Sequence, residues 1–289
     1  MPRLFSPRRV VQSFQRRSHQ VEFAKAVVDT AADLRKSPDA LFSTGTAFRS
    51  PQVGREAREL RDTLKALQQE GVERSVLKLA FLWHEEIADL FPHLVEETFA
   101  HAGVSAPTLV RDMTERAQDV ATALGSPFVA VDLLCSRFAR NTAPIHVDYG
   151  EYVTGGGAEL SADHVRSLSF VMPYVGRGTE YLVHSRDLVQ GPLLGGIKRR
   201  NNTVLGINEE FERCPEAARA HWVSTPSGSF AFHRNGLCLH RAPSSSDFRL
   251  LLAIDACLPA EKVAHPLQSL REALMRNVSR IRGHRSLLR

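Results

Sequence analysis

The sequence predicts an α+β protein, with helices in its first half, an antiparallel β-sandwich or barrel in its second half and a helix at its C-terminus. Up to about residue 125, apolar residues recur at spacings of three and four, which is typical of amphipathic helices. From about residue 127, β-branched and aromatic residues form short runs between clusters of Gly, Pro, Asn and Ser. Because most of these runs follow one another without an intervening helix, they favour antiparallel strands over a parallel, doubly wound sheet.

The predicted elements divide the chain into four parts. Residues 1–20 form a basic flexible arm, residues 21–126 a helical region that packs on the core, residues 127–259 the β-core and residues 260–289 a basic helix. Within the helical region, the clearest apolar stripe consists of Val76, Leu79, Ala80, Trp83, Ile87 and Leu90. Strands are expected at residues 128–138, 165–175, 179–185, 227–233 and 248–258, each bounded by turn-forming residues.

The composition excludes several classes of protein. Of 289 residues, 43% are hydrophobic and 24% are charged, and no apolar run reaches the roughly 18 residues of a membrane span. The net charge of +5 comes from the two ends, because residues 1–20 and 260–289 each carry +5 and leave −5 between them. This pattern argues against a nucleic-acid partner. Four cysteines without a CxxC pair favour a cytoplasmic location, although the Arg- and Ser-rich start also resembles an organellar transit peptide.

Two His-x-acid triplets are candidates for metal binding. Residues two apart point away from each other on a helix, so the pair of His84 and Glu86, expected on a helix, is interpreted as a solvated face. On a strand, residues two apart share a side, so His146 and Asp148 can reach one ion while Val147 faces the opposite way. The second triplet is therefore the candidate metal motif.

A third ligand is needed to complete this site. Two imidazoles and one carboxylate form the facial arrangement that holds non-haem Fe(II) and leaves coordination positions open. His240 follows a run of short strands and is the first candidate, with His233 as the second.

Arg249 is a candidate for binding an anion. It lies inside the apolar run 248–254, where a guanidinium needs an anionic partner to offset its desolvation. That partner is either an internal carboxylate, such as Asp255 or Asp247, or the carboxylate of a bound molecule. The residues alone leave both possibilities open.

Several motifs in order resemble the Fe(II)- and 2-oxoglutarate-dependent oxygenases, in particular the prolyl-hydroxylase-like members. IHVDYG is similar to their first metal motif, MPYVGRGTEYL to their glycine turn and following strand, and TPSGSFAFHRNGLCLHRAP to their late segment with the distal histidine. Arg249 follows His240 by nine residues, at the place of the family's co-substrate arginine. The resemblance covers residues 140–256 and implies a double-stranded β-helix, or jelly-roll, core.

The resemblance also implies an activity. Fe(II) would be held by His146, Asp148 and His240, with O2 and 2-oxoglutarate as co-substrates and Arg249 on the distal carboxylate of 2-oxoglutarate. A carboxylate at position 148 favours hydroxylation, desaturation or oxidative cyclisation over halogenation. We expect the substrate to be a small, carboxylate-bearing molecule. Its candidate contacts are Arg137, Asn141, Tyr149, Tyr174 and Tyr181.

Residues 189–212 form a long insertion between the glycine turn and the late segment. Its basic residues Lys198, Arg199 and Arg200 belong either to a solvated loop or to a loop that closes over an acidic substrate. Two other functions stay open: a cupin-like metalloenzyme that does not use 2-oxoglutarate, and a non-enzymatic interaction module. The sequence determines neither the substrate nor the oligomeric state.

Overall fold

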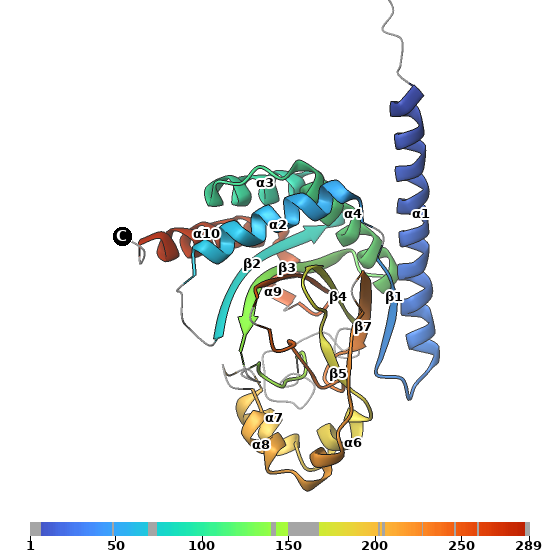
Figure 1. The fold of residues 1–289 in the computed structure, drawn as a ribbon, viewed down its shortest axis with the longest axis vertical. Helices are drawn as coiled ribbons and strands as arrows, with labels where there is room; N and C mark the ends of the chain where they lie inside the picture. Colours follow the sequence, from blue (N-terminus) through green and yellow to red (C-terminus); the bar gives the residue numbers. More distant parts are fainter. Residues whose placement is uncertain are drawn as a thin grey trace, which may run out of the picture.

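The protein has two antiparallel β-sheets, and helices cover the outer face of the larger one (Figure 1). The computed structural model describes residues 7–47, 49–68, 74–139, 143–149, 168–201, 203, 206–226, 228–245, 247–258 and 260–286.

The large sheet has six strands in the order β1-β7-β4-β9-β3-β2. They are β1 (Phe42–Thr46), β2 (Arg74–His84), β3 (Phe128–Phe138), β4 (Leu168–Val175), β7 (Ser229–Arg234) and β9 (Arg249–Asp255). The small sheet has the order β6-β5-β8 and contains β5 (Glu180–Leu182), β6 (Trp222–Ser224) and β8 (His240–Arg241). A bridge between His146 and His240 adds one more chain segment beside β8.

This topology is the predicted double-stranded β-helix. From β3 onward, eight chain segments are distributed over the two sheets: β3, the segment around His146, β4, β5, β6, β7, β8 and β9. The large sheet joins the first, eighth, third and sixth of these segments, and the small sheet joins the second, seventh, fourth and fifth. Side chains of both sheets, among them Val171, Tyr181 and Leu251, meet in one apolar cluster between them.

Alternation along the strands separates two environments. On β9, Leu250, Leu252 and Ile254 pack into the main hydrophobic core under the helices, whereas Leu251 faces the small sheet. The main helices are α1 (Pro7–Lys36), α2 (Pro51–Ala66), α3 (Leu90–Ala102), α4 (Pro107–Leu124) and α10 (Pro266–Ser286). The shorter ones are η1 (Glu85–Ile87), α6 (Ser185–Gln190), α7 (Leu194–Arg200), α8 (Asn208–Glu212), η2 (Pro215–Arg219) and α9 (Ala260–Ala264). None of the helices in the described ranges has both the length and the apolarity that a bilayer crossing requires.

The first part of the chain differs from the prediction in two places. The apolar stripe from Val76 to Leu90 was expected on a helix, but its first part lies in strand β2, which pairs along its whole length with β3. The apolar residues of β2 fit a strand period of two as well as a helical period, and the strand period buries Leu77 and Leu79 in the main core. Pairing with β3 therefore decided that this segment is a strand. Helix α1 begins at Pro7, so most of the expected flexible arm is helical.

The outer edge of β2 is covered by an asparagine. The Asn277 carboxamide in α10 accepts a hydrogen bond from the N–H of Ala80 (2.9 Å) and donates one to the carbonyl of Ala80 (2.8 Å). Arg280 donates to the neighbouring carbonyl of Lys78 at 2.8 Å. Asn277 is fully buried, so it satisfies backbone groups that an open sheet edge would leave without partners.

Replacing Asn277 therefore tests the attachment of α10. We expect Asn277→Leu to lower the free energy of unfolding by about 2 to 4 kcal/mol, because the two backbone polar groups of Ala80 lose their partners in a partly buried place. Urea denaturation measures the change. Arg276→Ala, in an exposed pair with Glu272, is the control and should cost about 0.5 kcal/mol or less. Equal stability of Asn277→Leu and wild type would contradict this account of the edge.

Candidate metal centre

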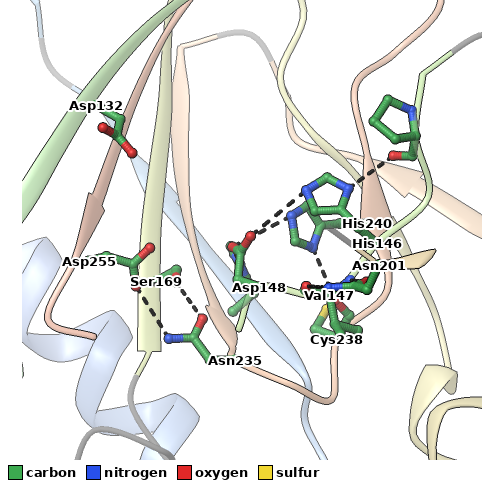
Figure 2. A network of polar contacts seen from close by, with 12 residues as sticks. Asp132, His146, Val147, Asp148, Ser169, Asn201, Asn235, Cys238, His240 and Asp255 are labelled. Atoms are coloured by element: carbon green, nitrogen blue, oxygen red, sulfur yellow. Dashed lines mark hydrogen bonds and ion pairs between the residues drawn. The ribbon is translucent and has the colours of Figure 1, made fainter. Parts of the chain in front are cut away.

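Strand pairing brings two distant histidines together. The N–H of His146 donates to the carbonyl of His240 (3.1 Å), and the N–H of His240 donates to the carbonyl of His146 (3.0 Å). Ile145 and Val147 pack into an apolar cluster on the outside, so His146 and Asp148 share the opposite side, as the period of a strand predicts. The two imidazole centroids lie 4.2 Å apart (Figure 2).

The backbone determines how both imidazoles are protonated. The Nδ1 of His146 lies 3.0 Å from the carbonyl oxygen of Pro144, and the Nδ1 of His240 lies 3.0 Å from that of Cys238. A carbonyl oxygen only accepts hydrogen bonds, so each Nδ1 carries a proton and donates it, which leaves each Nε2 as the nitrogen that faces Asp148. Fixing a ligand histidine through its second nitrogen is common in metal sites.

Asp148 completes a set of three facing lone-pair donors. Its carboxylate oxygens lie 3.8 Å from Nε2 of His146 and 3.6 Å from Nε2 of His240. One ligand atom from each of the three residues lies within 4.8 Å of the other two. These nitrogen and oxygen atoms can all offer lone pairs to one cation, which would bring them together favourably. Two imidazoles and a carboxylate in this arrangement suit a divalent transition metal such as Fe(II).

The surroundings keep the ligands in the required protonation states. Burial lowers the pKa of His240 to about 3, so its imidazole is neutral at pH 7. Burial alone would raise the pKa of Asp148, but the hydrogen bond from His233 holds that pKa well below its usual value. Asp148 is therefore a carboxylate.

His233, the second candidate for the third ligand, supports the carboxylate. Its Nε2 donates to Oδ2 of Asp148 at 2.7 Å, and its Nδ1 lies 3.3 Å from the hydroxyl of Tyr181. The ring is fully buried at the end of β7. Its nitrogens do not belong to the group of converging ligand atoms found among the described residues. His233 thus orients Asp148, and Tyr181 in turn orients His233.

Arg249 is a buried cation without a carboxylate partner in the described part of the chain. Its side chain faces between the sheets, where its Nε donates to the hydroxyl of Ser136 at 3.2 Å. Its Nη1 is buried and has no hydrogen-bond partner among the residues that the structure describes. Burial lowers the pKa of Arg249 to about 10, so the group stays charged at pH 7. Asp255, one of the expected internal partners, bonds elsewhere, and an unpaired buried guanidinium favours a bound anion.

The glycine turn makes room for this arginine. Gly176 has a φ of 84°, and a Cβ on it would lie 3.0 Å from Cβ of Arg249. A side chain at this position would therefore strain the turn and crowd the arginine. Ser136 was missed by the sequence analysis because its contact depends on the register of β3 with β9.

The five predicted substrate contacts do not lie together. Arg137 is on the helix side of β3, with its guanidinium 5.3 Å from the centre of the Phe248 ring. Tyr174 also faces the helices and donates to Asp112 of α4 at 2.7 Å. These two predictions are wrong, because each residue is one position away from those that face inward. Tyr181 and Tyr149 lie near the metal motif, and Asn141 is outside the described residues.

Two other sequence interpretations also change. His84 is not on a solvated helix: it ends β2, is buried and accepts a hydrogen bond from the N–H of Glu86. The described part of the insertion contains α7 and α8, on which Lys198 and Arg199 are exposed. Arg200 pairs with Glu209 (2.8 Å) and Glu210 (3.2 Å), so its charge is already neutralised within the insertion.

A second polar group lies beside the carboxylate of Asp148 (Figure 2). Asp255 accepts hydrogen bonds from the hydroxyl of Ser169 (2.6 Å) and the amide of Asn235 (3.3 Å). Burial and the nearby charge of Asp148 raise the pKa of Asp255 to about 7. Its place was predictable in part, because alternation along β9 puts Asp255 on the same face as Arg249.

Comparisons with known proteins give structural likeness only. No family model and no curated protein matches the chain. Solved structures that match include the epimerase SnoN with Fe3+, alpha ketoglutarate and nogalamycin RO (13% identity, 80% of this chain and 84% of that one, TM-score 0.44). A prolyl-4-hydroxylase from Pseudomonas putida matches at 12% identity over 79% of this chain and 97% of its own (TM-score 0.41). AtDAO1, a dioxygenase for auxin oxidation from Arabidopsis thaliana in complex with 2-oxoglutarate, matches at 10% identity over 80% and 88% (TM-score 0.41). Similarity this low transfers none of these activities to this chain.

The raised pKa of Asp255 predicts a pH-dependent stability. An aspartate in the unfolded chain titrates near 4, so between about pH 4 and pH 7 the folded state binds more protons. The stabilisation is complete below about pH 4 and is lost as the pH rises through about 7. We expect Asp255→Asn to gain stability relative to wild type over this range, by up to about 4 kcal/mol. Chemical denaturation of both proteins at several pH values measures the difference, and parallel stability curves would contradict the prediction.

Proposed function

We propose that the protein is an Fe(II)- and 2-oxoglutarate-dependent oxygenase that acts on an unactivated C–H bond of a small molecule. The observation that carries this proposal is the convergence of Nε2 of His146, a carboxylate oxygen of Asp148 and Nε2 of His240. Arg249 supports the part of the proposal that concerns 2-oxoglutarate, because its buried Nη1 has no partner in the described part of the chain.

The three converging residues would hold Fe(II), and they leave coordination positions for other ligands. When bound, Fe(II) with 2-oxoglutarate and O2 supplies an oxidant strong enough to remove hydrogen from an unactivated carbon. The protein's part is to hold the ligand atoms in place. The Nδ1–H bonds of His146 and His240 direct their Nε2 lone pairs, and His233 holds the carboxylate of Asp148.

Arg249 would bind the distal carboxylate of 2-oxoglutarate. Its Nε is held by Ser136, which leaves the Nη side of the planar guanidinium for two parallel, charge-assisted hydrogen bonds. A bound carboxylate would also offset the cost of burying this cation. A cupin-like metalloenzyme that does not use 2-oxoglutarate would need another role for Arg249.

The substrate is proposed only as a small molecule. The expectation that it carries a carboxylate rested partly on Arg137 and the basic insertion, but Arg137 faces the helices and Arg200 pairs with glutamates. Hydroxylation, desaturation and oxidative cyclisation are all compatible with a carboxylate ligand at position 148. The cytoplasmic location stays a prediction from the cysteine pattern.

Anaerobic titration of the Fe(II)-loaded protein with 2-oxoglutarate tests the proposal. We expect the weak visible charge-transfer band of the iron chelate in wild type, and its loss in His146→Ala. Arg249→Ala should weaken 2-oxoglutarate binding about 100-fold, because two charge-assisted hydrogen bonds are lost. Arg137→Gln, on the other face of β3, is the control and should bind as wild type does. No band in wild type, or a band unaffected by both alanine variants, would refute the assignment.

A further inference from the structure

The metal-binding segment is the outermost member of the small sheet. On its inner side, the backbone of His146 pairs with His240 of β8. The backbone groups of the alternate residues 143, 145 and 147 point the other way, because N–H and C=O directions alternate along a strand. An edge of this kind leaves polar groups that must find other partners.

Two asparagine carboxamides of the insertion occupy this edge. Asn201 accepts a hydrogen bond from the N–H of Val147 (2.8 Å) and donates one to its carbonyl (2.6 Å). Asn208 accepts from the N–H of Ile145 (2.7 Å) and donates to the carbonyl of Ala143 (2.9 Å). A carboxamide offers the same donor and acceptor as a peptide group. The two side chains therefore act as a neighbouring strand would.

The backbone of the insertion adds to these contacts. The N–H of Ile207 donates to the carbonyl of Ile145 at 2.9 Å. Gly206 has a φ of 60°, and a Cβ on it would lie 2.4 Å from the same carbonyl oxygen. Glycine is therefore required where the insertion passes this close to the metal-binding segment.

Apolar packing and ion pairs hold the insertion in this position. Ile145 and Val147 share a buried cluster with Leu193, Ile197 and Ile207 of the insertion. The pairs of Arg200 with Glu209 and Glu210 connect the end of α7, next to Asn201, with α8, which begins at Asn208. The two asparagines are thus attached to one small unit.

We propose that the insertion is a clamp that positions the metal ligands, with Asn201 and Asn208 as its positioning residues. His146 and Asp148 flank Val147, so holding both polar groups of Val147 from outside restricts the backbone on either side of it. Arg199 and Arg200 of the insertion pair with glutamates of α8. This inference rests on the proposed metal centre but is independent of 2-oxoglutarate and of the substrate.

Co(II) titration of the full-length protein, followed by visible absorption, tests the clamp. Leucine is close in size to asparagine and removes both hydrogen bonds without adding charge. We expect Asn201→Leu and Asn208→Leu to bind Co(II) about 10- to 100-fold more weakly than wild type, as when outer partners of metal ligands are removed. Even without metal, hydrogen exchange should become faster at the Val147 amide in Asn201→Leu and at the Ile145 amide in Asn208→Leu.

Asn277→Leu is the matched control. It removes the same kind of two-bond carboxamide clamp from β2, an edge strand of the large sheet, so it lowers stability but should leave Co(II) affinity unchanged. Gly206→Ala is a second clamp variant that leaves both asparagines in place and displaces the loop. It should weaken Co(II) binding as well, and it replaces any leucine variant that does not fold.

The outcomes separate the two proposals. Wild-type Co(II) affinity in the clamp variants would overturn the clamp, and so would an equal loss of affinity in Asn277→Leu, which would indicate a general loss of stability. If wild type binds no Co(II), the clamp and the proposed function fail together. If wild type binds Co(II) but not 2-oxoglutarate, the oxygenase assignment fails, and weaker Co(II) binding in the clamp variants still supports the clamp.

Discussion

The candidate metal centre depends on one antiparallel pairing, that of His146 with His240. Two backbone hydrogen bonds join residues that are far apart in the sequence and bring their imidazoles side by side. Each ring is then directed by a carbonyl two residues before it, so both Nε2 lone pairs point toward Asp148. A cation bound among these atoms would stabilise them together, and this favours the interpretation of the pairing as a metal site.

Buried polar groups explain much of the remaining architecture. Each outer edge described above meets a side chain that imitates a peptide: Asn277 at Ala80, Asn201 at Val147, and Asn208 at Ile145. A carboxamide is suited to this because it satisfies one donor and one acceptor together without bringing in charge. The buried Nη1 of Arg249 has no hydrogen-bond partner among the described residues, and it lies where an anionic ligand is proposed.

Local pattern was sufficient wherever one periodicity applied. Strand β3 has its predicted bounds, Phe128 to Phe138, and the alternation at 145–148 correctly separated the ligand side from Val147. The pattern was insufficient at β2, where two periods fitted the same apolar residues. It also failed for Arg137 and Tyr174. Alternate residues of a strand point to opposite faces of the sheet, and the sequence does not show which face lies between the two sheets and which lies under the helices.

The sequence by itself determined the period-two segments, the His-x-Asp spacing and the presence of an arginine in an apolar strand, because these are properties of neighbouring residues. The tertiary structure alone decided that His233 supports Asp148, that Ser136 holds Arg249 and that the insertion packs on the metal-binding segment. These contacts join residues 54 to 113 positions apart. Long-range contacts depend on strand register and on the need to satisfy buried polar groups, and a short stretch of sequence determines neither of these.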